Sequence, residues 1–502
     1  MDVFMQKRTM GIETEYGLLL RRSNGKFCQK PVNAKFLAHP WLTQTKTFDE
    51  LYLFKDENDP TKGLWIGANG GKIYHDTVAS SKDLDRAEYS SAECINGKDV
   101  ALYDAAGDLL MQKVRESFMR SGAFKRMHCA THAHEDVVIS KNNSDFIRPA
   151  EKPRESMHFY GSHENYIAYK RFFRVNEIDG FTECILPFLV SRTILHGSGG
   201  MWYTPESGWH YVISPRALAT FRAEGRSAIY ERPIIMSKDI GIDDRKKLYM
   251  RLHLVYGDSN MSPRSTWIRF DSTHLMLRVL EELGNEARLP VLENPMEALH
   301  AFATDTTLKA KAETHDHGHL TALDLQKLCI ELVQKLELSD YEKAFAEYWA
   351  SVVRRLEEDP LNLRKELDWV IKKNFIERSM ARHGYDIRHE KARVLDVSYS
   401  ELSPKGIYYR IEAAGGIEPL FAKKSVEAAL QTPPPETRAA LRSKYIIAVR
   451  KKFGKKSSGD CTLVRWESVH YAPKVRLDNP FATKSKRLTR VLNSKKFLNP
   501  AT

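Results

Sequence analysis

Three consecutive prolines constrain this chain more than any other feature of its sequence. They lie within Gln431–Thr437, and neither a helix nor a central strand continues through them, because proline fixes its own backbone angle and has no N–H donor. The composition changes just after them, since residues 441–502 hold 16 lysines and arginines against three acidic residues. The two signals coincide, so we expect a large domain over residues 1–430 and a small basic domain over residues 431–502.

The remaining composition is that of a globular protein outside the membrane. Hydrophobic residues make up 42% of the 502 positions and charged residues 28%, which is typical of a chain with a packed core. The longest nearly uncharged apolar stretch, Cys184–Val190, is far shorter than the ~20 residues that span a bilayer. The first residues lack the apolar core of a secretory signal, and the six cysteines form no Cys-x-x-Cys pair. We therefore expect a cytoplasmic protein with reduced thiols.

Hydrophobic periodicity predicts the α+β class. Apolar residues recur three and four apart in five segments, which indicates helices at 100–120, 266–284, 320–336, 341–357 and 363–383. Short segments rich in β-branched and aromatic residues predict strands at 8–20, 71–76, 162–169 and 249–256. The polar, proline-containing stretch 141–157 is interpreted as a surface insertion.

Two glutamates stand out in the first predicted strand. Residues two apart in a strand share a face, so Glu13 and Glu15 present both carboxylates in one direction. Two like charges at that distance need a cation, a shared proton or open water. Mg²⁺, which prefers a few carboxylates together with phosphate oxygens, suits such a pair. The alternative is an acidic strand face exposed to solvent.

The second group of polar residues follows Asn69. Lys72, Tyr74 and Asp76 share a face by the same spacing, and they offer a cation for a phosphate, a hydroxyl and a general base. Glu88 and Glu93 add carboxylates shortly afterwards, although their odd separation puts them on opposite faces of a regular strand.

The third group lies in the later predicted strands. Arg251 and His253 share a face, which suits an arginine contact to phosphate beside an imidazole ligand. A hydrogen-bonded core histidine is the alternative. The chain has neither a Gly-x-x-x-x-Gly-Lys-Ser/Thr loop nor the protein-kinase signatures, so any use of ATP requires a different architecture.

Taken together, these motifs resemble the family of the Pup ligase and the related depupylase (Pup deamidase), within the carboxylate-amine ligase superfamily that includes glutamine synthetase. The similarity extends almost end to end. It rests on Met10–Gly17, Ile73–Asp76 with Ala87–Tyr89 and Ala92–Cys94, Gly161–Tyr166, Leu186–Arg192, Arg232–Ile235, Arg251–His253 with Gly257–Met261, Glu366–Ile371 and Pro433–Arg438.

The resemblance implies a glutamine-synthetase-like curved antiparallel sheet packed with helices, carrying ATP and Mg²⁺, with a small C-terminal domain. It implies Mg²⁺ at Glu13, Tyr74 and Glu88, to which strand spacing adds Glu15, and Asp76 as the catalytic aspartate. It further implies ATP contacts from Lys72, Ser91 and Trp466, phosphate contacts from Arg232 and Arg251, and a metal or phosphate contact from His253.

Loop length favours the ligase branch over the depupylase branch. The depupylase branch carries a long extra loop before the catalytic aspartate strand, whereas 62 residues separate Glu13 from Asp76 here. We therefore expect ATP-dependent ligation of the C-terminal glutamate side chain of a small acidic Pup-like modifier to target lysines, through a γ-glutamyl phosphate. The alternative is hydrolysis of the corresponding amide or isopeptide bond at the same site.

Two other classes of function remain at this point. The basic segment 441–502 is expected to help dock the acidic modifier, but it would also suit a nucleic acid. It has few aromatic residues among its charges, so stacking on bases has weak support. A ligase for free glutamate and a small amine is the third candidate.

Overall fold

The structure is a computed structural model of the 502-residue chain. It describes residues 7–22, 27, 51–55, 63–76, 86–120, 134–144, 159–169, 178–228, 230–237, 249–453, 468–469 and 475–494. The chain forms two compact units whose segments alternate along the sequence. Unit 1 comprises Met1–Arg8, Asn96–Ala101 and Ser140–Leu420, and unit 2 comprises Thr9–Ile95, Leu102–Ile139 and Phe421–Thr502. The domain division at residue 430 stays a prediction.

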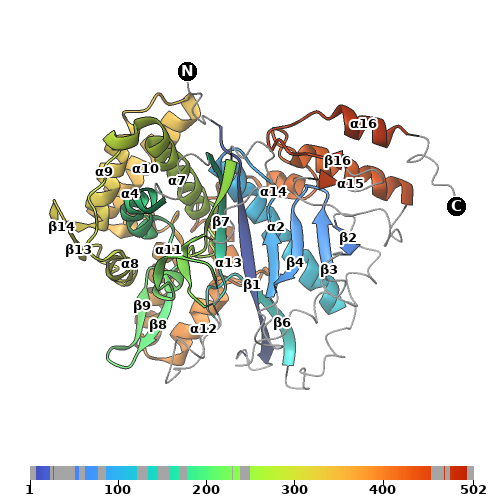
Figure 1. Ribbon diagram of the computed structural model, residues 1–502. Coiled ribbons are helices and arrows are strands. Elements are labelled where there is room, and N and C mark those ends of the chain that lie inside the picture. Colours follow the sequence, from blue (N-terminus) through green and yellow to red (C-terminus); the bar gives the residue numbers. More distant parts are fainter. Residues whose placement is uncertain are drawn as a thin grey trace. The chain divides into compact units, whose positions relative to one another are not determined.

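Unit 2 contains strands in the order β6-β1-β5-β4-β3-β2, in which the pairs from β1 to β2 are antiparallel, and several of them are visible side by side in Figure 1. The bounds are β1 Met10–Arg22, β2 Leu51–Lys55, β3 Gly63–Gly67, β4 Lys72–Asp76, β5 Arg86–Ser90 and β6 His134–Ser140.

Helix α2 (Gly97–Arg120) covers one face of these strands. Thr14 Oγ1 of β1 donates to Asp104 of the helix at 2.9 Å, and Tyr16 Oη donates to Asp108 at 3.0 Å. The approach is close, because a Cβ on Gly107 would lie 2.3 Å from the Tyr89 ring. Side chains alternate along a strand, so Thr14, Tyr16 and Tyr89 point toward α2. The residues next to them along β1 and β5 point to the opposite face.

The C-terminal part of unit 2 has an apolar core of its own. Leu441, Tyr445 and Ile446 of α15 pack with Val469, Val475 and Leu488 of the segments that follow. The bounds are α14 Lys423–Ala429, α15 Ala439–Phe453, β15 Ser468–Val469, β16 Val475–Arg476 and α16 Lys486–Leu492.

Unit 1 combines a sheet with many helices. Its strands follow the order β10-β11-β12-β7, in which β10 and β11 are parallel and the other pairs antiparallel, and it also has the hairpins β8–β9 and β13–β14. The strand bounds are β7 Ser162–Tyr169, β8 Gly200–Thr204, β9 Gly208–Val212, β10 Arg222–Gly225, β11 Pro233–Met236, β12 Tyr249–Leu254, β13 Lys311–Thr314 and β14 Gly318–Thr321.

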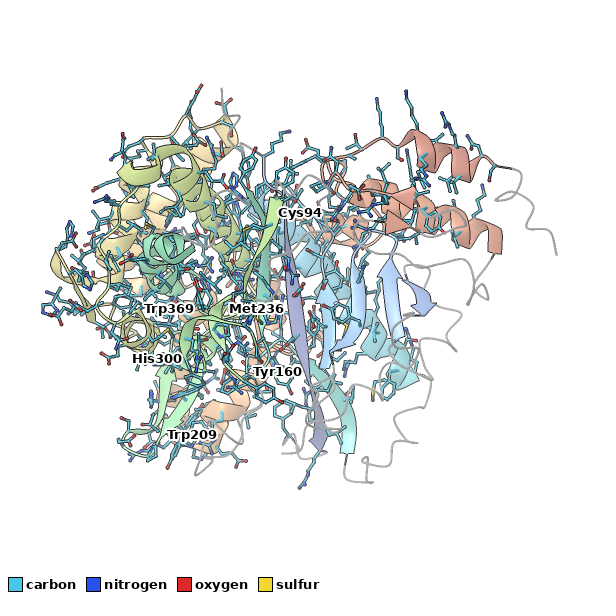
Figure 2. All side chains as sticks on the ribbon, in the orientation of Figure 1. Cys94, Tyr160, Trp209, Met236, His300 and Trp369 are labelled. Atoms are coloured by element: carbon cyan, nitrogen blue, oxygen red, sulfur yellow. The ribbon has the colours of Figure 1, made fainter. Side chains whose placement is uncertain are left out.

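The helices of unit 1 bury large aromatic residues among them. Trp369, 1% exposed, lies deep among these side chains and donates its indole N–H to Ile194 O at 2.8 Å (Figure 2). The bounds are α4 Ile178–Ser191, α5 Thr193–His196, α6 Pro215–Leu218, α7 Pro263–Leu283, η3 Gly284–Glu286, α8 Pro295–Thr304, α9 Ala322–Val333, α10 Asp340–Glu358, η4 Pro360–Leu363, α11 Asp368–His383, α12 Glu390–Tyr399 and α13 Ile407–Ala413. Among the residues described, no helix is both long and apolar enough to span a bilayer.

The predicted α+β class, with an antiparallel sheet packed by helices, is confirmed. The predicted strands correspond to β1, β4, β7 and β12, each displaced by at most two residues at either end. The helix predicted from residue 320 begins only at Ala322, because Leu320 and Thr321 belong to β14 and Thr321 caps the helix through a capping box with Asp324. The last predicted helix begins at Asp368, after the 3₁₀ turn η4.

The prediction of a surface insertion at 141–157 is wrong for its first four residues. Lys141, Asn142, Asn143 and Ser144 are all buried. The Asn143 amide donates to Ser198 Oγ at 2.6 Å and accepts from Ser259 N at 2.8 Å. Polar side chains often indicate an exposed segment, but here the side chains of Asn142 and Asn143 bond to buried backbone groups. The rest of this stretch lies outside the described residues.

Candidate active site

The strands β1, β5 and β4 place six polar residues on one face. Glu13 pairs with Ser90 across the sheet, and Ser90 pairs with Lys72. In the next row on this face, Glu15 pairs with Glu88, and Glu88 pairs with Tyr74. Residues opposite each other, and residues two apart, point to the same side of a sheet. The carboxylate face is therefore Glu13, Glu15, Lys72, Tyr74, Glu88 and Ser90, on the side away from α2.

Two like charges stand opposite each other on this face. Glu15 and Glu88 are each only 4% exposed and occupy directly paired positions, where Cβ atoms lie about 4.5–5.5 Å apart. Like charges in such positions destabilise a sheet, and burial in a low dielectric increases the repulsion. A positive charge, from Lys72 on the same face or from a bound metal ion, would offset this repulsion.

Tyr74 connects the two rows of the carboxylate face. Its hydroxyl donates to Glu88 Oε1 at 2.5 Å and lies 3.0 Å from Ser90 Oγ. Burial raises the pKa of Tyr74 well above its usual value, and the charges of Glu88 and Glu13 raise it further. The phenol therefore stays protonated at neutral pH and orients Glu88. Its predicted contact with Mg²⁺ stays a prediction.

Ser91 is the serine predicted to contact ATP, whereas Ser90 is the serine that lies on the carboxylate face. Ser91 is 4% exposed, and its hydroxyl accepts from Ile12 N and donates to Ala92 O, both at 3.1 Å. Ser90 instead faces Tyr74 beside Lys72. The two-residue spacing from Glu88 was the signal that could have indicated Ser90. The ATP contacts of Lys72 and Ser91 stay predictions.

Two residues with predicted roles lie partly or wholly outside the described part of the chain. Asp76 ends β4, where its backbone pairs with Arg86 of β5, but its side chain is not described. Trp466 falls wholly outside the described residues. The catalytic role of Asp76 and the nucleotide contact of Trp466 stay predictions.

Unit 1 holds a second polar group, on β7 and β12. Arg251 Nη1 donates to Asn165 Oδ1 at 3.0 Å, and Nη2 lies 3.3 Å from His253 Nδ1. The His253 ring meets the His163 ring edge to face, with 5.3 Å between centroids. The spacing of Arg251 and His253 thus brings them together, as predicted, and the structure adds Asn165 and His163. Their contacts with phosphate or metal stay predictions.

Arg232 lies at the turn before β11. Its guanidinium lies 4.8 Å from the centre of the Phe159 ring, as in a cation–π contact. Its backbone φ of 44° is in the left-handed region, which is costly for a residue other than glycine. The predicted phosphate contact of Arg232 stays a prediction.

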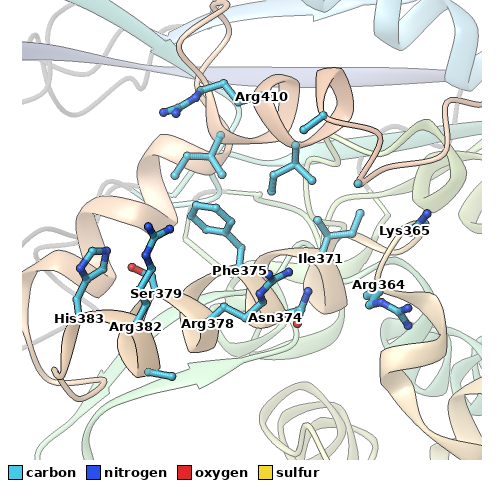
Figure 3. Close-up of a pocket in the computed structure, with 15 residues that line it drawn as sticks. Arg364, Lys365, Ile371, Asn374, Phe375, Arg378, Ser379, Arg382, His383 and Arg410 are labelled. Atoms are coloured by element: carbon cyan, nitrogen blue, oxygen red, sulfur yellow. The ribbon is translucent and has the colours of Figure 1, made fainter.

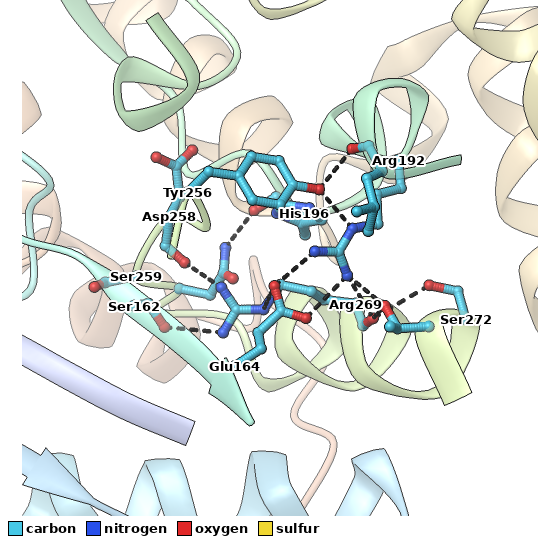
Figure 4. Close-up of polar contacts among 12 residues, drawn as sticks. Ser162, Glu164, Arg192, His196, Tyr256, Asp258, Ser259, Arg269 and Ser272 are labelled. Carbon is cyan, nitrogen blue, oxygen red and sulfur yellow. Dashed lines mark hydrogen bonds and ion pairs between the residues drawn. The ribbon is translucent and has the colours of Figure 1, made fainter. Parts of the chain in front are cut away.

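The other face of β7 carries a buried ionic cluster, shown in Figure 4. Glu164 receives a two-point contact from Arg192, whose nitrogens lie 2.7 and 2.9 Å from its two oxygens, and both side chains are fully buried. Arg269 lies 3.9 Å from the same carboxylate and donates to Ser162 Oγ at 2.9 Å. We call Glu164, Arg192 and Arg269 the buried cluster. Its hydrogen bonds join β7 to the helices of unit 1.

The Gly257–Met261 motif completes this structural framework. The Asp258 carboxylate accepts from the backbone N–H groups of Ser198 at 2.9 Å and Arg216 at 3.1 Å. Burial raises its pKa to about 6, although these hydrogen bonds oppose the shift. Asn260 donates to His196 O at 2.8 Å. These side chains fix the loop in place.

Glu93 has a role different from that of Glu88. It receives Arg438 Nε at 2.8 Å and Arg442 Nη1 at 2.9 Å, so it ties the end of β5 to the C-terminal part of unit 2. Burial raises its pKa, but Arg442 and Arg438 outweigh that effect and lower it to about 2. Arg438 is the last residue of the motif Pro433–Arg438. That motif was the only feature of the sequence that pointed to this contact.

Comparisons with known proteins agree with one another. The family model described as Pup-ligase protein matches residues 8–470. A Pup–protein ligase of Acidimicrobium ferrooxidans is 29% identical over 98% of this chain and 99% of its own length. A Pup–protein ligase of a Nocardioides species is 30% identical over 89% of this chain and 91% of its own length.

Solved structures show the same fold. The ligase PafA in complex with the prokaryotic ubiquitin-like protein Pup has a TM-score of 0.78 at 24% identity, covering 97% of this chain and 92% of its own. PafA in complex with ADP has a TM-score of 0.71 at 23% identity, covering 86% of this chain and 89% of its own.

Proposed function

The chain belongs to the Pup-ligase family, and from that premise we propose that it is an ATP-dependent ligase. It joins the side-chain carboxylate of the C-terminal glutamate of a small acidic Pup-like modifier to lysines of target proteins. The curated relatives carry the name of the ligase, so hydrolysis of the same bond by a depupylase is not favoured. The chain acts in the cytoplasm, where ATP is available.

The paired carboxylates Glu15 and Glu88 are the observation that carries this proposal. Together with Glu13 they offer the hard oxygen donors that Mg²⁺ prefers, so the residues present fit the ion. Bound there, Mg²⁺ would neutralise charge on the ATP phosphates. Tyr74 holds Glu88 in place through its hydrogen bond, and Lys72 on the same face contributes a positive charge toward phosphate.

The first chemical step activates an unreactive carboxylate. A carboxylate oxygen of the modifier attacks the γ-phosphorus of ATP, and the bond from that phosphorus to the ADP oxygen breaks. A γ-glutamyl phosphate and ADP result. Lys72, Ser91 and Trp466 of unit 2 are proposed contacts of the nucleotide, and Arg232, Arg251 and His253 of unit 1 are proposed contacts of phosphate.

The second step forms the isopeptide bond. A lysine ammonium has a pKa near 10.4 and must lose a proton before its nitrogen can attack. Asp76 takes that proton, the nitrogen attacks the acyl carbon, and phosphate leaves as the acyl C–O bond breaks. The basic segment 441–502 helps to dock the acidic modifier.

A reconstituted reaction tests the proposal. The purified chain is incubated with a Pup-like modifier ending in glutamate, a lysine-bearing protein, ATP and Mg²⁺, and the products are analysed by mass spectrometry. A conjugate equal to the sum of both proteins minus one water, formed with ADP, supports ligation. Release of modifier from a preformed conjugate without ATP turnover identifies a hydrolase, and turnover with free glutamate and a small amine alone identifies a small-molecule ligase.

A further inference from the structure

Figure 3 shows a groove in unit 1, between α11 and α13, with a volume of about 1000 Å³. None of the residues proposed to contact ATP or Mg²⁺ lines this groove. The structural support for one of these contacts lies in unit 2, in the turn that joins β3 to β4. This turn, residues 68–71, ends directly before Lys72, the first residue of β4. We call it the β3–β4 turn.

The β3–β4 turn is buried, whereas turns between strands usually lie at the surface. Its backbone groups must therefore find partners within the protein. Two backbone bonds close the turn, since Gly67 N donates to Gly71 O at 2.8 Å and Gly70 N donates to Gly67 O at 2.9 Å. The side chain of Asn69 adds a third bond, because its Oδ1 accepts from Gly71 N at 2.9 Å. Asparagine commonly fixes a turn by such a bond to the backbone two residues ahead.

The two glycines of this turn leave it little freedom to move. Gly70 has a φ of 84°, in the left-handed region that favours glycine. A Cβ on Gly71 would lie 2.9 Å from Tyr89 Oη and 3.1 Å from Ser90 O. The turn is thus packed closely against β5, and its exact position sets where the backbone of Lys72 begins.

The C-terminal part of unit 2 contacts the β3–β4 turn through two helices. Asn69 Nδ2 donates to Ala429 O, at the end of α14, at 2.9 Å. Carbonyl groups in the last turn of a helix have no partner within that helix, so this bond satisfies one of them. From α15, Arg442 Nη2 donates to Gly70 O at 3.3 Å, and a Cβ on Gly70 would lie 3.4 Å from Ala439 Cβ. Asn69, which is 2% exposed, is therefore bonded both to the turn and to α14.

Lys72 is the residue whose position depends on this arrangement. It is 8% exposed, and its backbone pairs with Ile66 of β3 and Ser90 of β5. Lysine carries a compact charge on a flexible four-carbon stem, so the place of that charge depends on where the backbone holds the stem. In an enzyme site, a displacement of about 1 Å can lower the rate by about 100-fold.

We propose that Asn69 is a positioning residue for the contact between Lys72 and ATP. By bonding both Gly71 N and Ala429 O, it fixes the start of β4 against α14, and the Lys72 ammonium group is held ready for a phosphate. The C-terminal part of unit 2 thereby supports nucleotide binding through the backbone of the β3–β4 turn. The inference rests on the proposed function, in particular on the ATP contact of Lys72.

The alternative is that Asn69 only stabilises the fold, as a buried hydrogen-bonded side chain does. The two roles differ in what they predict for ATP. Loss of a purely structural residue lowers the free energy of unfolding and leaves the ATP affinity of the folded protein unchanged. Loss of a positioning residue lowers that affinity, and it does so only while Lys72 is present.

A double-mutant cycle with the full chain tests the proposal. Mg²⁺-dependent ATP binding is measured by isothermal titration calorimetry for Asn69→Ala, Lys72→Ala and the double variant, and urea unfolding shows whether each is folded. We expect each single variant to bind ATP about tenfold more weakly than the wild type. The double variant should bind within about twofold of Lys72→Ala, because neighbouring residues that act through one contact are not additive.

Asn69→Ser keeps the proposal testable if the alanine variant does not fold. The serine hydroxyl can still accept from Gly71 N, though more weakly, and it is too short to replace the bond to Ala429 O. We expect it to lose less ATP affinity than Asn69→Ala, about threefold. The same cycle with Lys72→Ala is then measured in the serine background.

Asn479→Ala is the matched control. Asn479 Oδ1 also accepts from the backbone N–H two residues ahead, that of Phe481, at 3.0 Å, but in an exposed turn of unit 2 that carries none of the proposed contacts. Its ATP affinity should change by less than about twofold.

Three results would overturn the inference. Normal ATP affinity in folded Asn69→Ala would leave the residue with a structural role only. Additive losses in the double variant would show that Asn69 acts without Lys72. Normal ATP affinity in Lys72→Ala would remove the contact that Asn69 is proposed to position.

Failure of the proposed function gives a different result. A wild type that binds ATP but forms no conjugate would contradict the ligase proposal alone, and the cycle would still decide the role of Asn69. A wild type that binds no ATP in the presence of Mg²⁺ would overturn both.

Discussion

The carboxylate face of unit 2 and the buried cluster of unit 1 contain similar residues, but we expect them to have different roles. Both contain glutamates less than 5% exposed. In the buried cluster, the two oxygens of Glu164 receive a two-point contact from Arg192. On the carboxylate face, Glu15 and Glu88 are set directly opposite each other. A carboxylate bound by an arginine supports the fold, whereas we propose that the opposed carboxylates bind a cation.

This difference predicts opposite responses to loss of one charge. Neutralising a member of the buried cluster leaves a buried opposite charge and should damage the fold. Neutralising a member of the carboxylate face removes a repulsion and should damage ligand binding instead.

The largest expected effect is that of Glu164→Gln on stability. The change leaves the guanidinium groups of Arg192 and Arg269 buried beside a neutral amide, and breaking a buried pair in this way costs about 3–5 kcal/mol. The free energy of unfolding in urea measures the loss. Glu347→Gln, at an exposed position on α10, is the control and should change stability by less than about 0.5 kcal/mol. A loss below about 1 kcal/mol for Glu164→Gln would mean that the cluster is not structural.

Glu93 of unit 2 is paired with arginines, as Glu164 is, so its loss should also lower the stability of the fold. Its pKa of about 2 lies below the ordinary 4.5, so its stabilising effect is fully present above pH 4.5 and is lost as the pH falls through 2. A shift of this size corresponds to about 3 kcal/mol. Glu93→Gln should therefore destabilise the protein by about that amount at pH 7, and the difference from the wild type should shrink toward pH 2. A difference that stays constant with pH would contradict the assignment.

A smaller effect, on chemistry alone, is expected for Asp76→Asn. The amide keeps the shape of the side chain and cannot accept the lysine proton, so turnover should fall by about 100-fold or more while ATP still binds. Conjugate formation and ATP affinity, measured on the same preparation, separate the two steps. Near wild-type conjugation by the Asn variant would remove Asp76 from the mechanism.

The local part of this architecture could be predicted from the sequence. The strand at 162–169 was predicted with its observed ends, and the shared face of Glu13 and Glu15 follows from an alternation that needs no tertiary information. The start of α9 was missed because residues 320–321 fit either element, and their pairing in a hairpin decided the outcome.

The pairing between strands could not be predicted in the same way. The positions of Glu15 opposite Glu88 and of Ser90 opposite Lys72 depend on register, which is set by contacts distant in sequence. The partner of Glu164 is 28 residues away, so the motif that contained Arg192 gave no sign of its role. The ion pairs of Glu93 could not be predicted for the same reason, because its arginine partners are distant in sequence.

The most direct test of the central claim is Mg²⁺-dependent ATP binding by Glu13→Gln, Glu15→Gln and Glu88→Gln, measured by isothermal titration calorimetry. Glu116→Gln, at an exposed position on α2, is the matched control within unit 2. We predict that each of the three variants loses ATP affinity by tens-fold, about 2 kcal/mol, while its stability in urea equals or exceeds that of the wild type and the control binds normally. Unchanged ATP affinity in all three, or a loss of stability as large as that of Glu164→Gln, would show that the opposed carboxylates serve the fold and not a ligand.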